Sequence, residues 1–265
     1  MITLSCTFDP VTEKEVRYIL SCRKEKGIRD LAVCVKGEGI LSREERTRLL
    51  KLAFAPYRHV YVTDSCDDAE TIEAMDEEAV RSGMFRLAAK GTRRVLMERG
   101  FYHVETARAM CKERRYVHSG GVAGVCKALA KAHGLDEMKA WRAGWLHDIT
   151  KAFSDEKSEE IIARWKPEWL NISPKVWHSY TAVIWLKQNM GLYDHDILNA
   201  LEHHTLGDGK SAYAWILYIA DKIEPGRGYD ASKEMAMAEK DLKTAAAYVL
   251  EESKAYIYEK EGIHV

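Results

Sequence analysis

The sequence contains no apolar run long enough to cross a membrane. Its longest uncharged apolar stretch, SAYAWILYIA at 211–220, has about half the length that a membrane-spanning helix requires. The N-terminus lacks the basic and apolar regions of a secretory signal peptide. We therefore expect a cytoplasmic protein that does not bind membranes.

The chain also has almost no excess of charge. Its 40 Lys and Arg residues nearly balance its 41 Asp and Glu residues, which leaves a formal net charge of -1. A chain that is nearly neutral has no global attraction for nucleic acid or for an anionic membrane. We expect no nucleic-acid partner, and any anionic substrate must be held by local cations.

The cysteines form no CxxC pair. They are scattered singly, which argues against a zinc ribbon and against a disulfide scaffold. We expect reduced, mostly structural thiols at Cys6, Cys22, Cys34, Cys66, Cys111 and Cys126.

The two halves of the chain have different patterns, and its 265 residues leave room for two domains. The first half alternates strand-like and helix-like segments: 2–8, 13–26, 31–35, 42–55 and 59–64. This rhythm predicts a parallel sheet. From about residue 66 onward we find no convincing strand, only helical periods separated by Gly, Pro and capping residues.

A histidine and an aspartate stand side by side in WRAGWLHDITK. We expect a helix over 136–149 that carries His147 and Asp148 at its end, where the last turn is free to tighten. A second pair, His195 and Asp196, follows Gly191 and opens the next helix, as in a solvated first turn. The second pair is therefore expected to lie on the surface.

Several further polar residues fall on apolar helix faces or at helix ends. A carboxylate on such a face is costly unless it is paired or bound to a metal ion. A helical bundle points such positions of consecutive helices at a common interior. Nitrogen and oxygen donors without a thiolate suit iron, manganese or zinc. We therefore expect one metal site built from His118, His147, Asp148, His178, His204 and Asp221.

Three cations lie close to these residues in the sequence. Arg115 precedes His118 by three residues, Lys151 follows Asp148 by three, and Arg227 lies just past the helix that carries Asp221. Together they predict a cationic rim around a metal, which is what a phosphate ester needs for charge neutralisation.

Five ordered motifs in 108–260 resemble the YqeK-type HD-domain hydrolases, the symmetrical diadenosine tetraphosphatases: RRYVHSGGVAGV, WLHDITK, VWHSYTA, EHHTLG and YIADKIEPGR. The resemblance implies an all-α HD-domain helical bundle and hydrolysis of diadenosine tetraphosphate to two ADP. It implies iron as the cofactor, with manganese or zinc as alternatives and one or two ions per chain. It assigns the metal ligands to His118, His147, Asp148 and Asp221, with His178 and His204 available for a second metal.

The same resemblance implies the remaining roles in the site. The residues that match substrate-binding positions are Arg115, Lys151, His178, His203, His204, Thr205 and Arg227. The expected catalytic residues are Asp148, Lys151 and His204.

The first half resembles a second family through TFDPVTEKE at 7–15. This segment is similar to the TFDP(I/V)(H/T)xGH signature of nicotinate-nucleotide and phosphopantetheine adenylyltransferases, but Lys14 and Glu15 replace its final Gly and His. A glutamate at that position would repel a triphosphate. We therefore expect residues 1–105 to form a degenerate nucleotidyltransferase-like, Rossmann-like α/β domain, followed by the HD domain at 106–265.

The leading hypothesis is a metal-dependent phosphohydrolase whose partner is a small nucleotide. One alternative keeps the metal but acts as an HD-type nucleoside monophosphatase. Another is a non-catalytic nucleotide-sensing or scaffold protein. A homodimer is the assembly to test.

Overall fold

The computed structural model describes residues 2–261 of the chain. Internal contacts divide the chain into two compact units, Met1–Glu105 with Gln188–Gly191, and Thr106–Lys187 with Leu192–Val265. The expected α/β fold followed by a helical HD domain is confirmed. Within the described range, no helix is both long and apolar enough to span a membrane.

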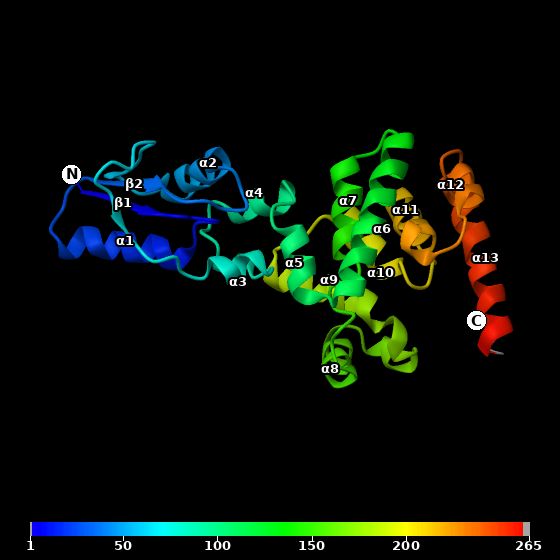
Figure 1. Cartoon of the computed structure of the whole chain (residues 1–265). Coiled ribbons are helices and arrows are strands. Elements are labelled where there is room, and N and C mark those ends of the chain that lie inside the picture. Colours follow the sequence, from blue (N-terminus) through cyan, green and yellow to red (C-terminus); the bar gives the residue numbers. More distant parts are fainter. Residues whose placement is uncertain (1, 262–265) are drawn as a thin grey trace. The chain divides into compact units, whose positions relative to one another are not determined.

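The first unit is built on a parallel sheet with the strand order β3-β2-β1-β4 (Figure 1). The five predicted segments form β1, α1, β2, α2 and β3, with ends shifted by at most a few residues. The strands are β1 (Ile2–Cys6), β2 (Leu31–Val35), β3 (Val60–Val62) and β4 (Glu70–Thr71). The helices are α1 (Glu13–Glu25), α2 (Arg43–Phe54), α3 (Glu77–Arg81) and α4 (Arg93–Glu98), after which the chain continues into α5 (His103–Met110).

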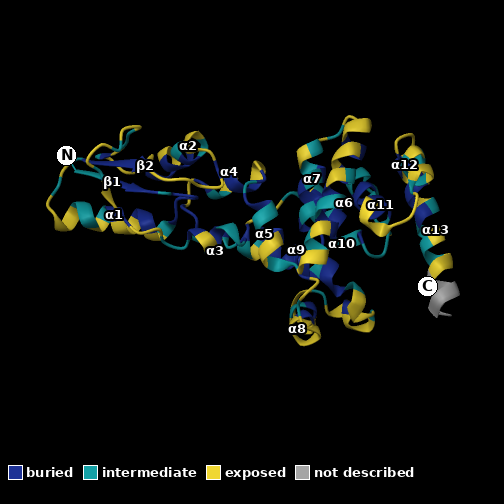
Figure 2. Ribbon diagram, viewed as in Figure 1, coloured by how far each residue is buried: buried dark blue, intermediate teal, exposed yellow. Residues whose placement is uncertain are grey.

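The sheet core follows from the apolar run LAVCV. All five residues of β2 are buried between β1 and β3, as Figure 2 shows by colour, because an inner strand of a parallel sheet is covered on both faces. Capping boxes fix where α1 and α2 begin. Thr12 and Glu15 form the box at the start of α1, and Ser42 and Glu45 form the box at the start of α2.

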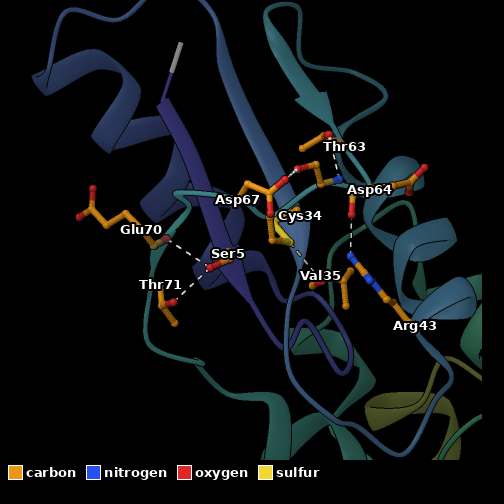
Figure 3. Close-up of a disulfide and its surroundings, with 11 residues drawn as sticks. Ser5, Cys34, Val35, Arg43, Thr63, Asp64, Asp67, Glu70 and Thr71 are labelled. Atoms are coloured by element: carbon orange, nitrogen blue, oxygen red, sulfur yellow. Dashed lines mark hydrogen bonds between the residues drawn. A yellow bond between two sulfur atoms is a disulfide. The ribbon is translucent and has the colours of Figure 1, made fainter.

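Strand β4 was not expected. It pairs with β1 through Leu4–Glu70 and Ser5–Thr71, and the hydroxyls of Ser5 and Thr71 lie 3.2 Å apart (Figure 3). The expectation that no strand follows residue 66 was wrong because β4 has two residues, both exposed. So short an edge strand has no apolar alternation from which it could be recognised.

The structure also corrects the expectation of reduced cysteines. Cys34 in β2 and Cys66 form a disulfide, with their Cα atoms 5.8 Å apart (Figure 3). The pair is separated by 32 residues and becomes close only when the chain after β3 returns to the sheet. Cys6, Cys22, Cys111 and Cys126 are free thiols, as expected.

The turn that resembles the adenylyltransferase signature is held by interior contacts. The Asp9 carboxylate accepts hydrogen bonds from the amides of Ile40 and Leu41 and from the hydroxyl of Tyr102. Glu15 is fully buried and accepts from the amides of Thr12 and Met75. The expected repulsion of a triphosphate by Glu15 was therefore wrong, because its carboxylate points into the interior, and burial raises its pKa to about 8.

The second unit is helical (Figure 1). Its helices are α6 (Glu113–Ala132), α7 (Glu137–Leu146), α8 (Asp155–Trp165), α9 (Trp177–Asn189), α10 (His195–His203), α11 (Ala212–Ile223), α12 (Ser232–Ala238) and α13 (Leu242–Glu261).

Helices α6, α7, α10 and α11 pack on one another and frame the interior of this unit. The close approach of α6 and α7 depends on small residues. A side-chain carbon added at Gly144 would lie 2.5 Å from Cα of Ala123, so glycine is required at this crossing. This packing brings the C-terminal end of α7 beside the histidine of α6.

Candidate metal centre

His147 and Asp148 lie immediately beyond α7. The helix begins after Asp136, whose side chain caps it, and ends at Leu146 rather than at residue 149 as expected. His147 is the C-cap residue, and Asp148 follows in the turn after the helix. Both are buried. The end of α7 therefore delivers two adjacent polar side chains to the interior, with Nε2 of His147 3.3 Å from Oδ2 of Asp148.

The four expected ligands converge in the interior of the second unit. His118 from α6 places Nε2 3.0 Å from Oδ1 of Asp221 on α11 and 3.9 Å from Oδ2 of Asp148. Nε2 of His147 lies 3.3 Å from Oδ2 of Asp148 and 3.8 Å from Oδ1 of Asp221. Two imidazole nitrogens and two carboxylate oxygens therefore surround one small volume.

The hydrogen bonds of the two histidines leave their inner nitrogens free. Nδ1 of His147 donates to the carbonyl of Gly144 at 2.7 Å, and Nδ1 of His118 donates to the carboxylate of Glu224 at 3.0 Å. The two Nε2 atoms are buried and have no hydrogen-bond partner in the described part of the chain. Buried acceptors without partners are costly, and a divalent cation would satisfy both of them. The residues therefore fit a metal ion.

A second group of candidate ligands shares Asp148 with the first. The first group consists of His118, His147, Asp148 and Asp221, and the second of Asp148, His178 and His204; we call them the two imidazole groups. Oδ1 of Asp148 lies 3.1 Å from Nε2 of His178 and 3.7 Å from Nε2 of His204. Nδ1 of His204 donates to the carbonyl of Leu201 at 2.6 Å, which again leaves Nε2 directed at the carboxylate. The ligand atoms of His118, His147 and Asp148 lie within 4.8 Å of one another, and so do those of Asp148, His178 and His204. Asp148 thus stands between two sets of imidazoles and offers one oxygen to each.

The charges in this interior favour a bound cation. Burial alone would raise the pKa of Asp148, but the imidazoles of His147, His178 and His204 outweigh it and hold the pKa well below its usual range. The pKa of Asp221 is likewise well below its usual range, because the Lys222 ammonium and His118 outweigh its burial. Burial lowers the pKa of His178 to about 4, so this imidazole is uncharged at pH 7, as a metal ligand must be. The centre therefore presents two carboxylates as anions.

A cavity of about 740 Å³ opens onto the cluster. All three expected cations line it, and each contacts a residue of the two imidazole groups. Nη1 of Arg115 lies 2.6 Å from Oδ2 of Asp148, and Nη2 of Arg227 lies 2.8 Å from Oδ1 of Asp221. Nζ of Lys151 lies 2.9 Å from Nδ1 of His178. Cations that line such a cavity can contact an anionic ligand.

The sequence did not single out other residues of this cavity. Lys112 and Arg114 also line it, and both are exposed. The basic run KERR at 112–115 was the available signal. Glu224 lines the cavity as well, although it is buried, and its partner is His118. Among the described residues, five Lys and Arg side chains line the cavity, and Asp148 and Glu224 are its acidic residues.

Three other residues from the sequence analysis lie outside the two imidazole groups. His203 is half-buried and pairs with Asp208 at 2.7 Å. The hydroxyl of Thr205 is buried and has no hydrogen-bond partner among residues 2–261. His195 is exposed, and its neighbour Asp196 pairs with Lys139 at 2.7 Å, so the second His-Asp pair is a surface feature as expected.

Comparisons with known proteins agree with this geometry. The HD domain family model matches residues 115–226, which contain every residue of the two imidazole groups. The symmetrical bis(5'-nucleosyl)-tetraphosphatase of Bacillus subtilis is 33% identical over 152 residues, covering 56% of this chain and 82% of that protein. The chain belongs to this family of HD-domain hydrolases.

A further relative and a solved structure are also similar to this chain. The probable nicotinate-nucleotide adenylyltransferase/Ap4A hydrolase of Mycoplasma pneumoniae is 30% identical over 184 residues, covering 66% of this chain and 53% of that protein. A solved structure, a predicted HD superfamily hydrolase involved in NAD metabolism from Clostridium acetobutylicum, matches with a TM-score of 0.56 and 31% identity. It covers 61% of this chain and 88% of that one. The HD domain is therefore similar to its relatives in both sequence and fold.

Proposed function

We propose that this protein is a metal-dependent hydrolase that cleaves diadenosine tetraphosphate symmetrically into two ADP. The observation that carries the proposal is the position of Asp148, between two groups of imidazoles and beside a cavity lined by five cations. A polyphosphate carries several negative charges in a row. A cationic cavity ending at a metal centre can bind such a chain and place one phosphorus at the metal.

His118, His147, Asp148 and Asp221 would hold the first ion, and Asp148, His178 and His204 are positioned for a second. We propose iron, with manganese or zinc as alternatives, because the donors are nitrogen and oxygen without a thiolate. When bound, such an ion polarises a phosphoryl oxygen and lowers the pKa of water in contact with it. The tautomers of His118, His147 and His204 are set by their Nδ1 partners, which keeps Nε2 available.

The cations of the cavity would bind the polyphosphate. Arg115, Lys151 and Arg227 stabilise the charge that develops on the phosphoryl oxygens. His178 or His204 would orient the polyphosphate chain, and neither would donate a proton to the departing ADP oxygen at pH 7, because burial lowers the pKa of both imidazoles. His203 and Thr205 lie beside His204 in the sequence and are proposed as further substrate contacts.

The products of diadenosine tetraphosphate test the proposal. Purified protein supplied with iron or manganese is expected to release ADP alone, because symmetric cleavage divides the tetraphosphate at its centre. Ion-exchange chromatography of the products is the measurement. AMP with ATP would mean asymmetric cleavage. Release of phosphate from AMP alone would favour a nucleoside monophosphatase, and binding without products would favour a sensor.

We further propose residues 1–105 as a degenerate nucleotidyltransferase-like domain and residues 106–265 as the hydrolase domain. Adenylyl transfer depends on donors placed around a triphosphate. Here the position of the signature histidine is Glu15, whose carboxylate accepts hydrogen bonds in the interior. Lys14 is exposed and pairs with Asp76 at 3.2 Å. The domain therefore lacks the imidazole donor that the reaction requires.

Adenylyl transfer by the full-length protein is expected to be undetectable. The assay uses ATP, magnesium and either nicotinate mononucleotide or phosphopantetheine, with pyrophosphate as the readout. An Asp148→Ala background removes the proposed hydrolase from the measurement. Sustained pyrophosphate release that requires the second substrate would overturn the assignment of the first domain.

A further inference from the structure

We propose that Glu224 is a positioning residue that joins the metal ligand His118 to the turn carrying Arg227. The proposal rests on the metal site proposed above and extends it to a residue that is not among the proposed metal ligands or phosphate-binding cations. Glu224 follows α11 directly and is 4% exposed. Its two carboxylate oxygens have different partners, His118 on α6 and the amide of Gly226 in the turn after α11.

The first oxygen fixes the histidine of α6. Oε1 of Glu224 lies 3.0 Å from Nδ1 of His118, so the ring donates its Nδ1 proton outward and keeps Nε2 toward Asp221. A carboxylate in this position sets the tautomer and the orientation of a ligating imidazole and increases its basicity. His118 is therefore held for coordination before any ion arrives.

The second oxygen fixes the turn after α11. Oε2 accepts a hydrogen bond from the amide of Gly226 at 2.6 Å, within the short helix Pro225–Arg227. Arg227 leaves this turn and returns to Asp221, donating to its backbone carbonyl and to Oδ1. The position of the guanidinium thus depends on a turn whose geometry Glu224 determines. The Glu224 carboxylate therefore positions both the proposed metal ligand His118 on α6 and the turn that carries the proposed phosphate-binding Arg227.

The glycine of the first motif makes room for this carboxylate. A side-chain carbon added at Gly121 would lie 2.5 Å from Oε2 of Glu224. Gly124 lies on the same helix, and a carbon added there would meet no described atom within 4 Å. The second glycine of HSGG, Gly121, therefore leaves the space that the Glu224 side chain occupies. Gly121 and Gly124 form a matched pair for an experiment.

The test measures Co²⁺ binding to the full-length protein by visible absorption, together with KM for diadenosine tetraphosphate. The variant Glu224→Gln keeps the size of the side chain, but its single carbonyl oxygen can accept from only one of the two donors. We expect a Co²⁺ dissociation constant raised by about 10- to 100-fold, a changed Co²⁺ spectrum and a higher KM. Gly121→Ala is expected to do the same in smaller measure, whereas Gly124→Ala leaves all three quantities unchanged.

A purely structural role would give a different result. It would lower the folded fraction but leave the dissociation constant, spectrum and KM of the folded protein as in the wild type, and that outcome overturns the proposal. If Glu224→Gln does not fold, the comparison of Gly121→Ala with Gly124→Ala decides, and equal behaviour of these two also overturns it. Failure of the wild-type protein to bind Co²⁺ would instead reject the metal site itself, so the two failures are distinguishable.

Discussion

Replacement of His147 by alanine is expected to lower the turnover of diadenosine tetraphosphate by roughly 10²- to 10³-fold or more, the loss typical when a group that organises transition-state charge is removed. His147 is fully buried, and its Nε2 lies 3.3 Å from Asp148 and 3.8 Å from Asp221. Alanine would remove one ligand and leave two carboxylates facing an empty volume. The measurement is kcat/KM at saturating metal.

The second His-Asp pair supplies the control. His195 stands beside an aspartate exactly as His147 does in sequence, but it is exposed at the start of α10. His195→Ala is expected to keep turnover within about threefold of the wild type, as surface substitutions away from a site usually do. Equal losses in the two variants would show that the cluster around His147 is not the catalytic centre.

The fold could be predicted from the sequence where local signals and tertiary packing agree. LAVCV is apolar throughout and became the inner strand β2, and Ser42 with Glu45 marks the beginning of α2. The edge strand β4 and the disulfide could not be predicted, because both depend on a return of the chain to the sheet. Nothing local distinguishes Cys66 from the free Cys22, and two exposed residues carry no periodicity.

The candidate site could be predicted in its residue types but not in its pairings. Polar residues on apolar faces indicated His118, His204 and Asp221, since such positions must find partners. Sequence did not indicate that Asp148 would be shared between two imidazole groups, because that depends on the turn that releases it from α7.

The roles of two glutamates also could not be inferred from the sequence. Glu224 was visible as a residue at the end of a helix, but its contact with His118 spans 106 residues. Glu15 was expected to face a triphosphate because only its position in a signature was known. The direction of its side chain is set by the amides of Thr12 and Met75.

Replacement of Asp148 by alanine is expected to abolish metal binding altogether. This carboxylate is the only residue common to both candidate groups among the described residues, with Oδ2 3.3 Å from His147 and Oδ1 3.1 Å from His178. Loss of any histidine leaves one group intact, whereas loss of Asp148 breaks both. Elemental analysis of protein purified without added metal should find about one or two iron, manganese or zinc ions per wild-type chain and none in the variant.

Thermal unfolding provides an independent measure of the same loss. An ion that binds only the folded state stabilises it by about 2.7 kcal/mol at a free concentration 100 times its dissociation constant. In a chain of about this size, each kcal/mol of stabilisation raises Tm by roughly 2 to 4 °C. Wild-type protein freed of metal with a chelator should show this rise when Mn²⁺ is added, and Asp148→Ala treated in the same way should show none. Asp196→Ala, from the surface pair, should respond as the wild type does. Full metal occupancy in Asp148→Ala, or an undiminished rise in its Tm, would contradict the assignment of Asp148 as the shared ligand, because each group would then bind its ion without the one side chain that they have in common.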